Sequence, residues 1–213
     1  TVDAEINVHD YQAVATLLLN KVDFATDLFF SEGVLDVLNH ASDQMLYGSK
    51  LGIDLTTKIE GEPGYNKEAS APHPHSELPS SEAVKEAFNW VKNCKILELK
   101  TQRPVLLVAL DKIGPHQGKQ FIQSFLDNPD FSAIEIVIVL EGHVDIENIS
   151  TVMWKLFNNL DPKRDFYFNA GRLGIDVTQK FPEEGYQQDW PEEIEMAPEI
   201  KTQVDQKWDD LFK

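Results

Sequence analysis

The chain has 213 residues, of which 36 are acidic and 19 basic, giving a formal net charge of −17. That balance argues against binding the nucleic-acid backbone, which requires clustered lysine and arginine. Hydrophobic residues make up 42% of the sequence, which is ordinary for a globular protein with its own core. The single cysteine, Cys94, excludes an intrachain disulfide, and the sequence shows neither an apolar run of ~18 residues nor a signal peptide. An acidic surface of this kind is typical of cytosolic proteins, so we expect a cytoplasmic location.

The first third of the chain predicts a helix followed by two short extended segments. Asn7 or Asp10 can cap a helix that runs to about Val22 with apolar residues at helical spacing. Asp27–Ser31 (DLFFS) is typical of a short strand, and Gly48–Asp54 combines a turn with an extended run.

The rest of the chain predicts alternating helices and strands after a loop. Gly61–Ser81 has four prolines, two glycines and no apolar periodicity, which indicates a linker or surface loop. Ser81–Trp90 begins a second predicted helix, with Cys94 near its end. The elements expected after it are strands at 105–110, 134–140 and 165–168 and helices at 118–126, 148–159 and 198–212. This order predicts a layered α/β fold with right-handed parallel crossovers.

Two stretches of the chain resemble each other. Lys50–Lys58 (KLGIDLTTK) recurs as Arg172–Lys180 (RLGIDVTQK), with six of nine positions identical. Upstream of each, Ile6–Phe30 aligns without gaps on Val144–Phe168. Because both matches come in the same order, the sequence predicts an internal duplication of one structural unit.

The first copy is expected to be incomplete at its N-terminal end. A buried strand ends at Leu140 just before the second copy, and the residue of the first copy aligned with it is Val2. We therefore expect residues 1–62 to form an N-terminally incomplete first repeat, and residues 63–103 a linker plus helix. Residues 104–213 would form the second α/β repeat with a C-terminal helix. The whole is then expected to be the C-terminal segment of a longer protein.

Few motifs point to chemistry. Gly114–Lys119 (GPHQGK) follows a strand and opens a helix as a phosphate-binding loop does, but it is one residue short of the GxxxxGK spacing. Gln120 stands where a magnesium-binding Ser or Thr belongs, so a plain turn is favoured. His73 and His75 are a possible metal pair, although no cysteine or carboxylate cluster lies at ligand spacing.

The duplicated ionisable residues admit two roles. Asp54 and Asp176, with Lys58 and Lys180, are acid–base residue types, but hydrogen bonding that fixes a turn is the favoured role. The glutamates near the C-terminus are predicted to form a solvated acidic face: Glu192, Glu193 and Glu195. No catalytic residue and no metal ligand is predicted in this chain.

Several motifs together resemble the C-terminal region of a long-form UbiD-type (3-octaprenyl-4-hydroxybenzoate carboxy-lyase-like) decarboxylase. The stretches that carry the resemblance are Asp36–Ser42 (DVLNHAS), Gly48–Lys58 with Gly61-Glu62, Asp145–Trp154 (DIENISTVMW), Asp161–Asp165 (DPKRD), Trp190–Glu193 (WPEE) and Val204–Leu211 (VDQKWDDL). They cover both repeats and the last helix, well over half of the chain.

The resemblance implies a reversible decarboxylation of aromatic or α,β-unsaturated acids that depends on prenylated FMN, with typical roles in ubiquinone or menaquinone biosynthesis. It also implies that the catalytic arginine and carboxylates and the Mn²⁺ ligands lie in preceding flavin-binding domains. One cofactor contact can be carried over, because Lys50 stands where the lysine of a Gly-Ser-Lys turn reaches the flavin phosphate in some members. Its counterpart is Arg172, preceded by Ala170-Gly171, which puts a second such site in doubt.

Our interpretation is a non-catalytic assembly and oligomerisation module of such a lyase. Its expected partners are its own missing flavin-binding domains and further copies of itself, with neither nucleic acid nor an integral membrane segment. Two alternatives stay open: a small lyase in its own right, and a freestanding α/β ligand-binding protein that uses the turn at 114–119.

Overall fold

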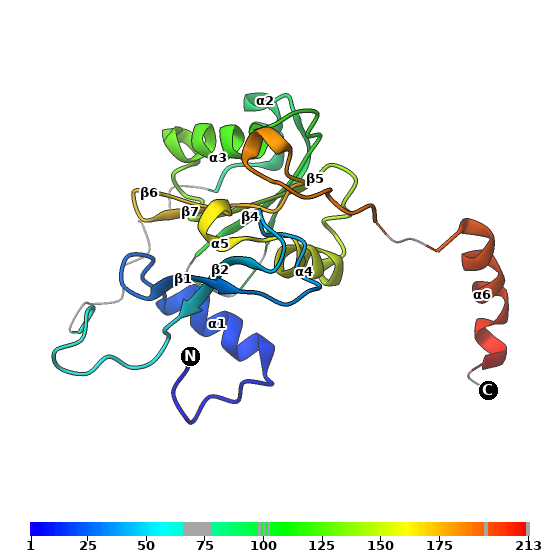
Figure 1. Ribbon diagram of the computed structural model, residues 1–213. Coiled ribbons are helices and arrows are strands. Elements are labelled where there is room, and N and C mark those ends of the chain that lie inside the picture. Colours follow the sequence, from blue (N-terminus) through cyan, green and yellow to red (C-terminus); the bar gives the residue numbers. More distant parts are fainter. Residues whose placement is uncertain (66–77, 98, 100, 102, 194–195, 212–213) are drawn as a thin grey trace.

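The computed structural model describes residues 1–65, 78–97, 99, 101, 103–193 and 196–211 (Figure 1). Its strands are β1 (Leu28–Val34), β2 (Tyr47–Ile53), β3 (Val91–Leu97), β4 (Val105–Leu110), β5 (Ile136–Glu141), β6 (Phe166–Asn169) and β7 (Arg172–Asp176). Its helices are α1 (Tyr11–Lys21), α2 (Ser81–Ala87), α3 (Gln117–Asp127), α4 (Ile149–Asn158), α5 (Pro162–Asp165) and α6 (Pro198–Leu211), with short 3₁₀ turns at Pro129–Phe131 and Pro182–Glu184.

A five-stranded sheet in the order β3-β4-β5-β7-β6 forms the centre of the molecule, and β1 and β2 form a separate antiparallel hairpin. All six residues of β4 are buried, as expected for a strand covered on both faces. In Figure 1, α2 and α3 lie above the sheet and α1 and α4 lie below it. The α/β fold class predicted from the sequence is therefore confirmed.

Two apolar clusters hold these layers together. On the α3 side, Phe121, Ile122 and Phe125 pack with Phe131 and the inward side chains of β4 and β5. The helical spacing in the sequence had predicted the inward face of α3, and its apolar members are all buried. On the opposite side, Leu19 of α1 and Val152 of α4 join one cluster with side chains of β4, β5 and β7.

The predicted parallel crossovers are only partly correct, because the sheet is mixed. β4, β5 and β7 run parallel, whereas β3 and β6 run antiparallel to their neighbours. The strand predicted at 165–168 is β6, an edge strand, and the parallel neighbour of β5 is β7. The physical reason is a two-residue hairpin between Asn169 and Arg172, in which Ala170 and Gly171 have φ values of 48° and 79°. Two successive positive φ values are typical of the tight turn that reverses a strand.

The helix predicted from Ser81 through Trp90 is wrong at its C-terminal end. α2 stops at Ala87, and Cys94 lies on β3, which pairs with β4. Cys94 is buried, and burial raises the pKa of its thiol. β3 falls inside the segment 63–103, so that segment contributes a strand to the sheet as well as a helix.

Apart from α5, which lies between α4 and β6, the two similar stretches have the same order of elements. α1, β1 and β2 correspond to α4, β6 and β7, so a helix followed by a strand occurs in both, as predicted. The loops before the helices also match. Asp10 caps α1 by accepting from Ala13 N–H at 2.9 Å, and Asn148 caps α4 by accepting from Thr151 N–H at 3.2 Å.

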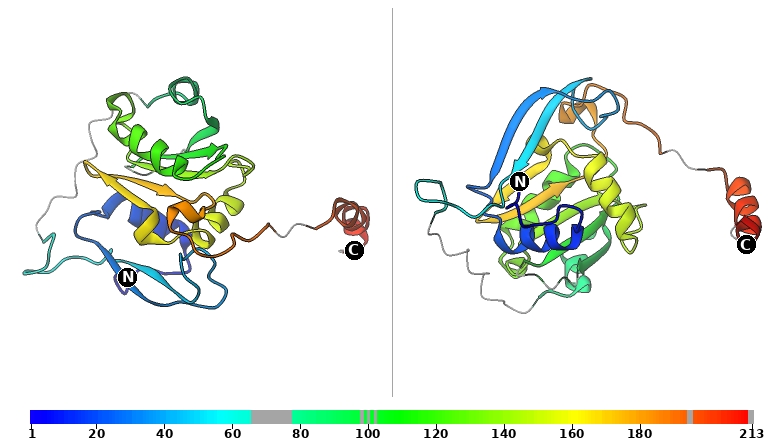
Figure 2. Two further views of the ribbon diagram at one scale, coloured as in Figure 1. Left: turned by 45° about the horizontal axis from the view of Figure 1, so that its top comes forward. Right: turned by 90° about the horizontal axis from the view of Figure 1, so that it is seen from below.

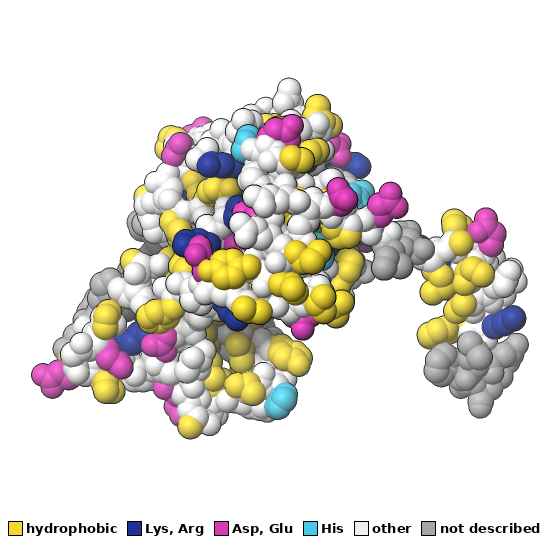
Figure 3. Space-filling view, viewed as in Figure 1, with side chains coloured by type: hydrophobic (Ala, Val, Ile, Leu, Met, Phe, Trp, Pro, Cys, Tyr) yellow, Lys and Arg dark blue, Asp and Glu magenta, His cyan; other side chains and the backbone are white. Residues whose placement is uncertain are grey.

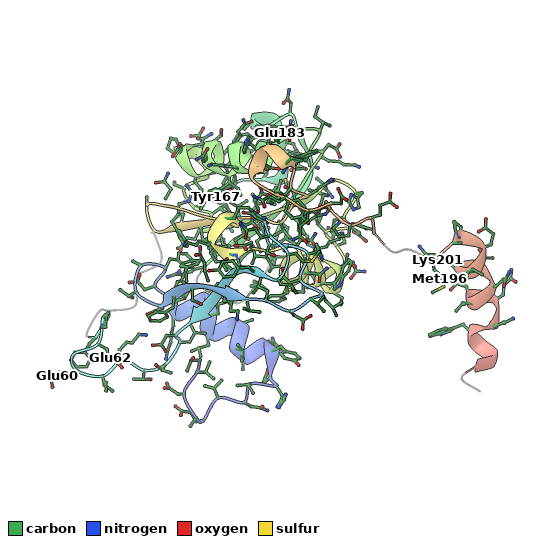
Figure 4. The ribbon with its side chains drawn as sticks, in the orientation of Figure 1. Glu60, Glu62, Tyr167, Glu183, Met196 and Lys201 are labelled. Atoms are coloured by element: carbon green, nitrogen blue, oxygen red, sulfur yellow. The ribbon has the colours of Figure 1, made fainter. Side chains whose placement is uncertain are left out.

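Two further segments complete the chain. α6 stands apart from the rest of the molecule in all three ribbon views (Figures 1 and 2), and its apolar stripe of Ile200, Val204 and Trp208 is exposed. Figure 4 shows Glu60 and Glu62 on the segment after β2, far from the sheet. Most of the loop predicted at 61–81, with His73 and His75, lies outside the described residues. Among the described residues, no helix has both the length and the apolar content needed to cross a bilayer.

Candidate functional site

A polar cluster lies where β2 ends. Lys58 Nζ lies 3.1 Å from Asp27 Oδ1 and 2.7 Å from Asp54 Oδ2. Asp54 Oδ1 also accepts from Thr56 N–H at 3.0 Å and from the Thr56 hydroxyl at 2.6 Å. These contacts fold the residues after β2 back against the strand. We call Asp27, Asp54, Thr56 and Lys58 the first cluster.

The aligned residues form a second cluster where β7 ends: Asp165, Asp176, Thr178 and Lys180. Lys180 Nζ lies 3.4 Å from Asp165 Oδ1 and 3.3 Å from Asp176 Oδ1. Asp176 Oδ1 accepts from Thr178 N–H at 3.0 Å and from its hydroxyl at 2.5 Å. The two clusters differ in depth, because the Lys180 side chain is 2% exposed and that of Lys58 is 17% exposed.

The electrostatics of Asp54 and Asp176 favour fixed charges over proton exchange, whereas burial raises the pKa of Asp165. Hydrogen bonds from Lys58 and Thr56 lower the pKa of Asp54 to about 2. Burial alone would raise the pKa of Asp176, but Lys180, Lys112 and Thr178 together lower it below its usual value. A general acid or base works best with a pKa near the operating pH. The turn-fixing role predicted for these residues therefore fits the geometry better than a catalytic role.

Lys50, the predicted cofactor contact, lies on β2 opposite Ser31 and is exposed. Its counterpart Arg172 has a different environment. The Arg172 guanidinium is buried and donates to the carbonyl oxygens of Leu126, Phe131 and Ile134 at 2.7–2.8 Å. Arg172 therefore secures the end of α3 and the loop before β5, and it is not available to a phosphate.

A seam of polar contacts joins the hairpin to α5. Ser49 N–H donates to Asp161 Oδ2 at 3.1 Å, and the Ser49 hydroxyl bonds to the same carboxylate. Ser49 Oγ accepts from Lys163 N–H at 2.9 Å, and Lys163 Nζ pairs with Glu32 at 2.7 Å. Gly48 is required at this seam, since a Cβ there would overlap Ser42, Leu35 and Asp161. The seam fixes the hairpin against the second stretch, beside an open pocket of about 390 Å³.

A larger open pocket, of about 580 Å³, lies at the carboxyl ends of β4 and β5. This edge of a parallel sheet is the usual ligand-binding side of α/β folds. Its ionisable lining residues are Lys92, Asp111, Lys112, Glu141, His143, Glu192 and Glu193. Burial lowers the pKa of Lys112, whose Nζ lies 2.8 Å from Glu184 Oε2.

Two predictions about this edge can be compared with the structure. Glu192 is exposed as predicted, but Glu193 is not simply solvated, because its carboxylate bonds to His143 and to the buried Lys155. Glu195 lies outside the described residues.

The turn at 114–119 is a plain turn, the favoured prediction. The N–H groups of Ile113 and Gly114 donate to Gln117 Oε1, and His116 N–H donates to Glu184. These amides are thus occupied within the protein, whereas a phosphate-binding loop presents its amides to the ligand. Lys119 Nζ lies over the ring of Tyr167 at 5.8 Å.

Within the described part of the chain, no group of three or more His, Cys, Asp or Glu side chains is arranged to hold a metal ion. The residues of this part therefore do not fit a manganese site.

The chain belongs to the family of UbiD-type C-terminal domains. The family model that matches is the 3-octaprenyl-4-hydroxybenzoate carboxy-lyase C-terminal domain, over residues 1–55 and 75–185. An uncharacterised protein of Archaeoglobus fulgidus is 30% identical over 122 residues, which is 49% of this chain and 25% of that protein. An uncharacterised protein of Helicobacter pylori strain 26695 is 25% identical over 206 residues, covering 94% of this chain and 31% of that protein. The chain thus spans between a quarter and a third of the length of these relatives.

Two solved structures match part of the chain. The vanillic acid decarboxylase of Sedimentibacter hydroxybenzoicus, in its closed form, matches with a TM-score of 0.48 and 20% identity, covering 62% of this chain and 31% of that chain. The UbiD-class enzyme HmfF of Pelotomaculum thermopropionicum, in complex with prFMN, matches with a TM-score of 0.44 and 21% identity, covering 57% and 26%.

Proposed function

We propose that this chain is the C-terminal assembly and oligomerisation module of a UbiD-like, prenylated-FMN-dependent aromatic-acid (de)carboxylase linked to quinone biosynthesis. Membership of the UbiD C-terminal family supports the decarboxylase part. In this proposal the reacting groups, the flavin ring and Mn²⁺ belong to the rest of the whole protein. This chain holds that part in place and links the copies.

One observation carries the assembly role: the outer face of α4 is apolar and exposed. Ile149, Met153, Trp154 and Phe157 are 44%, 42%, 55% and 74% exposed, while Val152 on the same helix packs into the core. Figure 3 shows hydrophobic side chains gathered over α4. Four large apolar side chains on one short helix exceed the single exposed residues that are normal on a surface, and they mark a protein contact.

The oligomeric state of the whole protein tests this role. Replacing Phe157 by Asp places a charge in the proposed contact and should shift the sedimentation profile to smaller species with unchanged far-UV circular dichroism. Ile113→Asp is the matched control, because Ile113 is also apolar, is 87% exposed and lies outside the α4 face. Identical profiles for Phe157→Asp and the control would refute the assembly role of α4.

We also propose that Lys50 contacts the flavin phosphate from the exposed hairpin. Removing one such exposed charge–phosphate contact costs roughly 1–2 kcal/mol, so Lys50→Ala in the whole enzyme should weaken flavin retention by about tenfold. Lys207→Ala, on exposed α6, should leave retention unchanged. If Lys50→Ala retains flavin as well as the wild type does, Lys50 does not contact the flavin phosphate.

The isolated chain is proposed to be inactive. With prenylated FMN, Mn²⁺ and a panel of aromatic acids, its turnover should stay at background. Turnover that Lys50→Ala abolishes would instead establish this chain as a small lyase.

We further propose that the two similar stretches arose by internal duplication. The matched caps and the matched Asp–Thr–Lys clusters support this proposal, because unrelated segments seldom share side-chain hydrogen bonds at aligned positions. Superposing residues 6–30 plus 50–58 on residues 144–168 plus 172–180 tests it. Divergent paths of the aligned backbones would contradict it.

A further inference from the structure

The aligned strands β2 and β7 have different neighbours. β7 pairs with β6 on one side and, in parallel, with β5 on the other. Within the described residues β2 pairs with β1 only. The second edge of β2 therefore presents backbone groups with no strand beside them, which is a template for adding one.

Thr1 already stands where a residue of β5 stands in the second stretch. The gapless alignment sets Thr1 against Val139. Leu55 N–H donates to Thr1 O at 2.9 Å, as Val177 N–H donates to Val139 O at 2.9 Å. The amino group of Thr1 also donates to Ile53 O at 2.7 Å.

The next residues keep the same register. The Asp3 carboxylate accepts from Thr57 N–H at 3.0 and 3.1 Å, and the aligned Glu141 accepts from Gln179 N–H at 2.8 Å. Residues 1–3 thus follow the path of the last residues of β5.

The open part of the β2 edge has defined limits. Asp54 N–H donates to Asp27 O and therefore points toward β1. Successive N–H groups along a strand point to opposite edges, so those of Leu51 and Ile53 point away from β1. Leu173, aligned with Leu51, donates to Glu135 O ahead of β5 at 2.8 Å. One step earlier, the Asp161 carboxylate holds Ser49 N–H and closes the edge. Thr1 closes the other end, because it bonds to Leu55 N–H and Ile53 O. The N–H groups of Leu51 and Ile53, between these two limits, remain open.

α1 is less well covered than α4, as expected if a strand beside β2 is missing. Val152 of α4 is 2% exposed beneath β5 and β7, whereas the aligned Val14 of α1 is only half-buried. A strand beside β2 in the place that β5 takes beside β7 would supply the apolar cover that Val14 lacks.

We propose that the open edge of β2 binds an apolar strand of about five residues, parallel to β2, formed by the polypeptide that leads directly into Thr1. The relatives, of which this chain spans a quarter to a third, have the length to supply it. The inference rests on the proposed duplication and is independent of the flavin chemistry.

A grafted strand tests the proposal. A second copy of Ile134–Ile138 (IEIVI), fused directly before Thr1, reproduces the register of β5. Amide hydrogen exchange of Leu51 and Ile53 should slow by about 100-fold relative to the unextended chain. The control extension IEIPI places proline at the position of Val137, which removes a ladder donor, so it should leave both amides unprotected.

Three outcomes would overturn the proposal. Equal exchange rates with the two extensions would show that the edge does not accept a strand. Protection of Leu51 and Ile53 in the unextended chain that rises with concentration would assign the edge to a second copy. Fast exchange of both amides in the whole protein would show that the edge stays open there. The Phe157→Asp sedimentation test addresses assembly through α4 separately, so the two ideas can fail independently.

Discussion

Side chains at aligned positions make the same contacts but differ in burial. The two Asp–Thr–Lys clusters are the clearest example. Lys58 and Lys180 each bridge two aspartates, but only Lys180 does so in the interior. A lysine that neutralises buried carboxylates cannot be removed without leaving uncompensated charge. The same change at the half-buried site is screened by solvent.

The difference in burial predicts that replacing Lys180 destabilises the fold more than replacing Lys58, which serves as the matched control. Lys180→Met leaves Asp176 buried without its ion-pair partner, whereas Asp165 keeps Arg164 at 2.7 Å, and the loss should cost about 3–5 kcal/mol in the free energy of unfolding. Lys58→Met should cost about 1 kcal/mol. Urea denaturation followed by circular dichroism measures both. Equal losses would mean that the depth of the second cluster does not determine its energetics.

The pH dependence of stability follows from Asp54. Its folded pKa of about 2 lies below its ordinary value of 3.8, so its ionised form stabilises the fold fully above about pH 4. That stabilisation disappears as the pH falls from about 4 to 2. Asp54→Asn should therefore flatten the stability curve in this window, whereas Glu5→Gln, at an exposed position, should not. Parallel curves for the wild type and Asp54→Asn between pH 4 and 2 would contradict the assignment.

At the scale of elements, the strongly patterned segments were predictable, whereas the existence of β3 and the direction of β6 were not. The continuous apolar run of β4 and the 3.6-residue spacing of α3 each allow a single placement. β3 was missed because Val91 and Cys94 extend a helical spacing that begins in α2, and the sheet overrides it. β6 was placed in parallel because the Ala170-Gly171 turn does not have the Asn-Gly composition that marks a two-residue hairpin.

In the candidate site, too, some features could be predicted from the sequence and others could not. The turn-fixing role of the clusters was predictable because the same residue types recur at the same spacing in both stretches. The burial of Arg172 and the contact of Lys155 with Glu193 were not, since both depend on partners at least 38 residues away in the chain.

The contact between β7 and α3 gives a prediction at this scale. A Cβ at Gly174 would overlap the side chain of Ile122, so that side chain or α3 must shift if Gly174 becomes Ala. Overpacking of this kind costs about 1–3 kcal/mol. Gly33→Ala on β1 is the matched control, because nothing lies within 4 Å of its added Cβ. Thermal denaturation should show a lower midpoint for Gly174→Ala only, and an unchanged midpoint would mean that α3 adjusts without cost.

At the scale of the whole molecule, three features lie on surfaces that the described chain leaves uncovered: the α4 face, the edge of β2 and the stripe on α6. α6 stands apart from the sheet (Figures 1 and 2), and it exposes the apolar side chains of Ile200, Val204 and Trp208. We therefore expect α6 to pack on another copy, most simply in a symmetric dimer.

Replacing Trp208 by Ala tests this role of α6. Because the Trp208 side chain is 55% exposed, its loss should leave the fold intact, with unchanged far-UV circular dichroism and a similar unfolding midpoint. Loss of a large aromatic side chain at a dimer contact should weaken association by about 2 kcal/mol or more, so the variant should sediment as a monomer at concentrations where the wild type is dimeric. Lys207→Ala, its neighbour on α6, is the control. A wild-type chain that stays monomeric at high concentration would rule out self-association through α6.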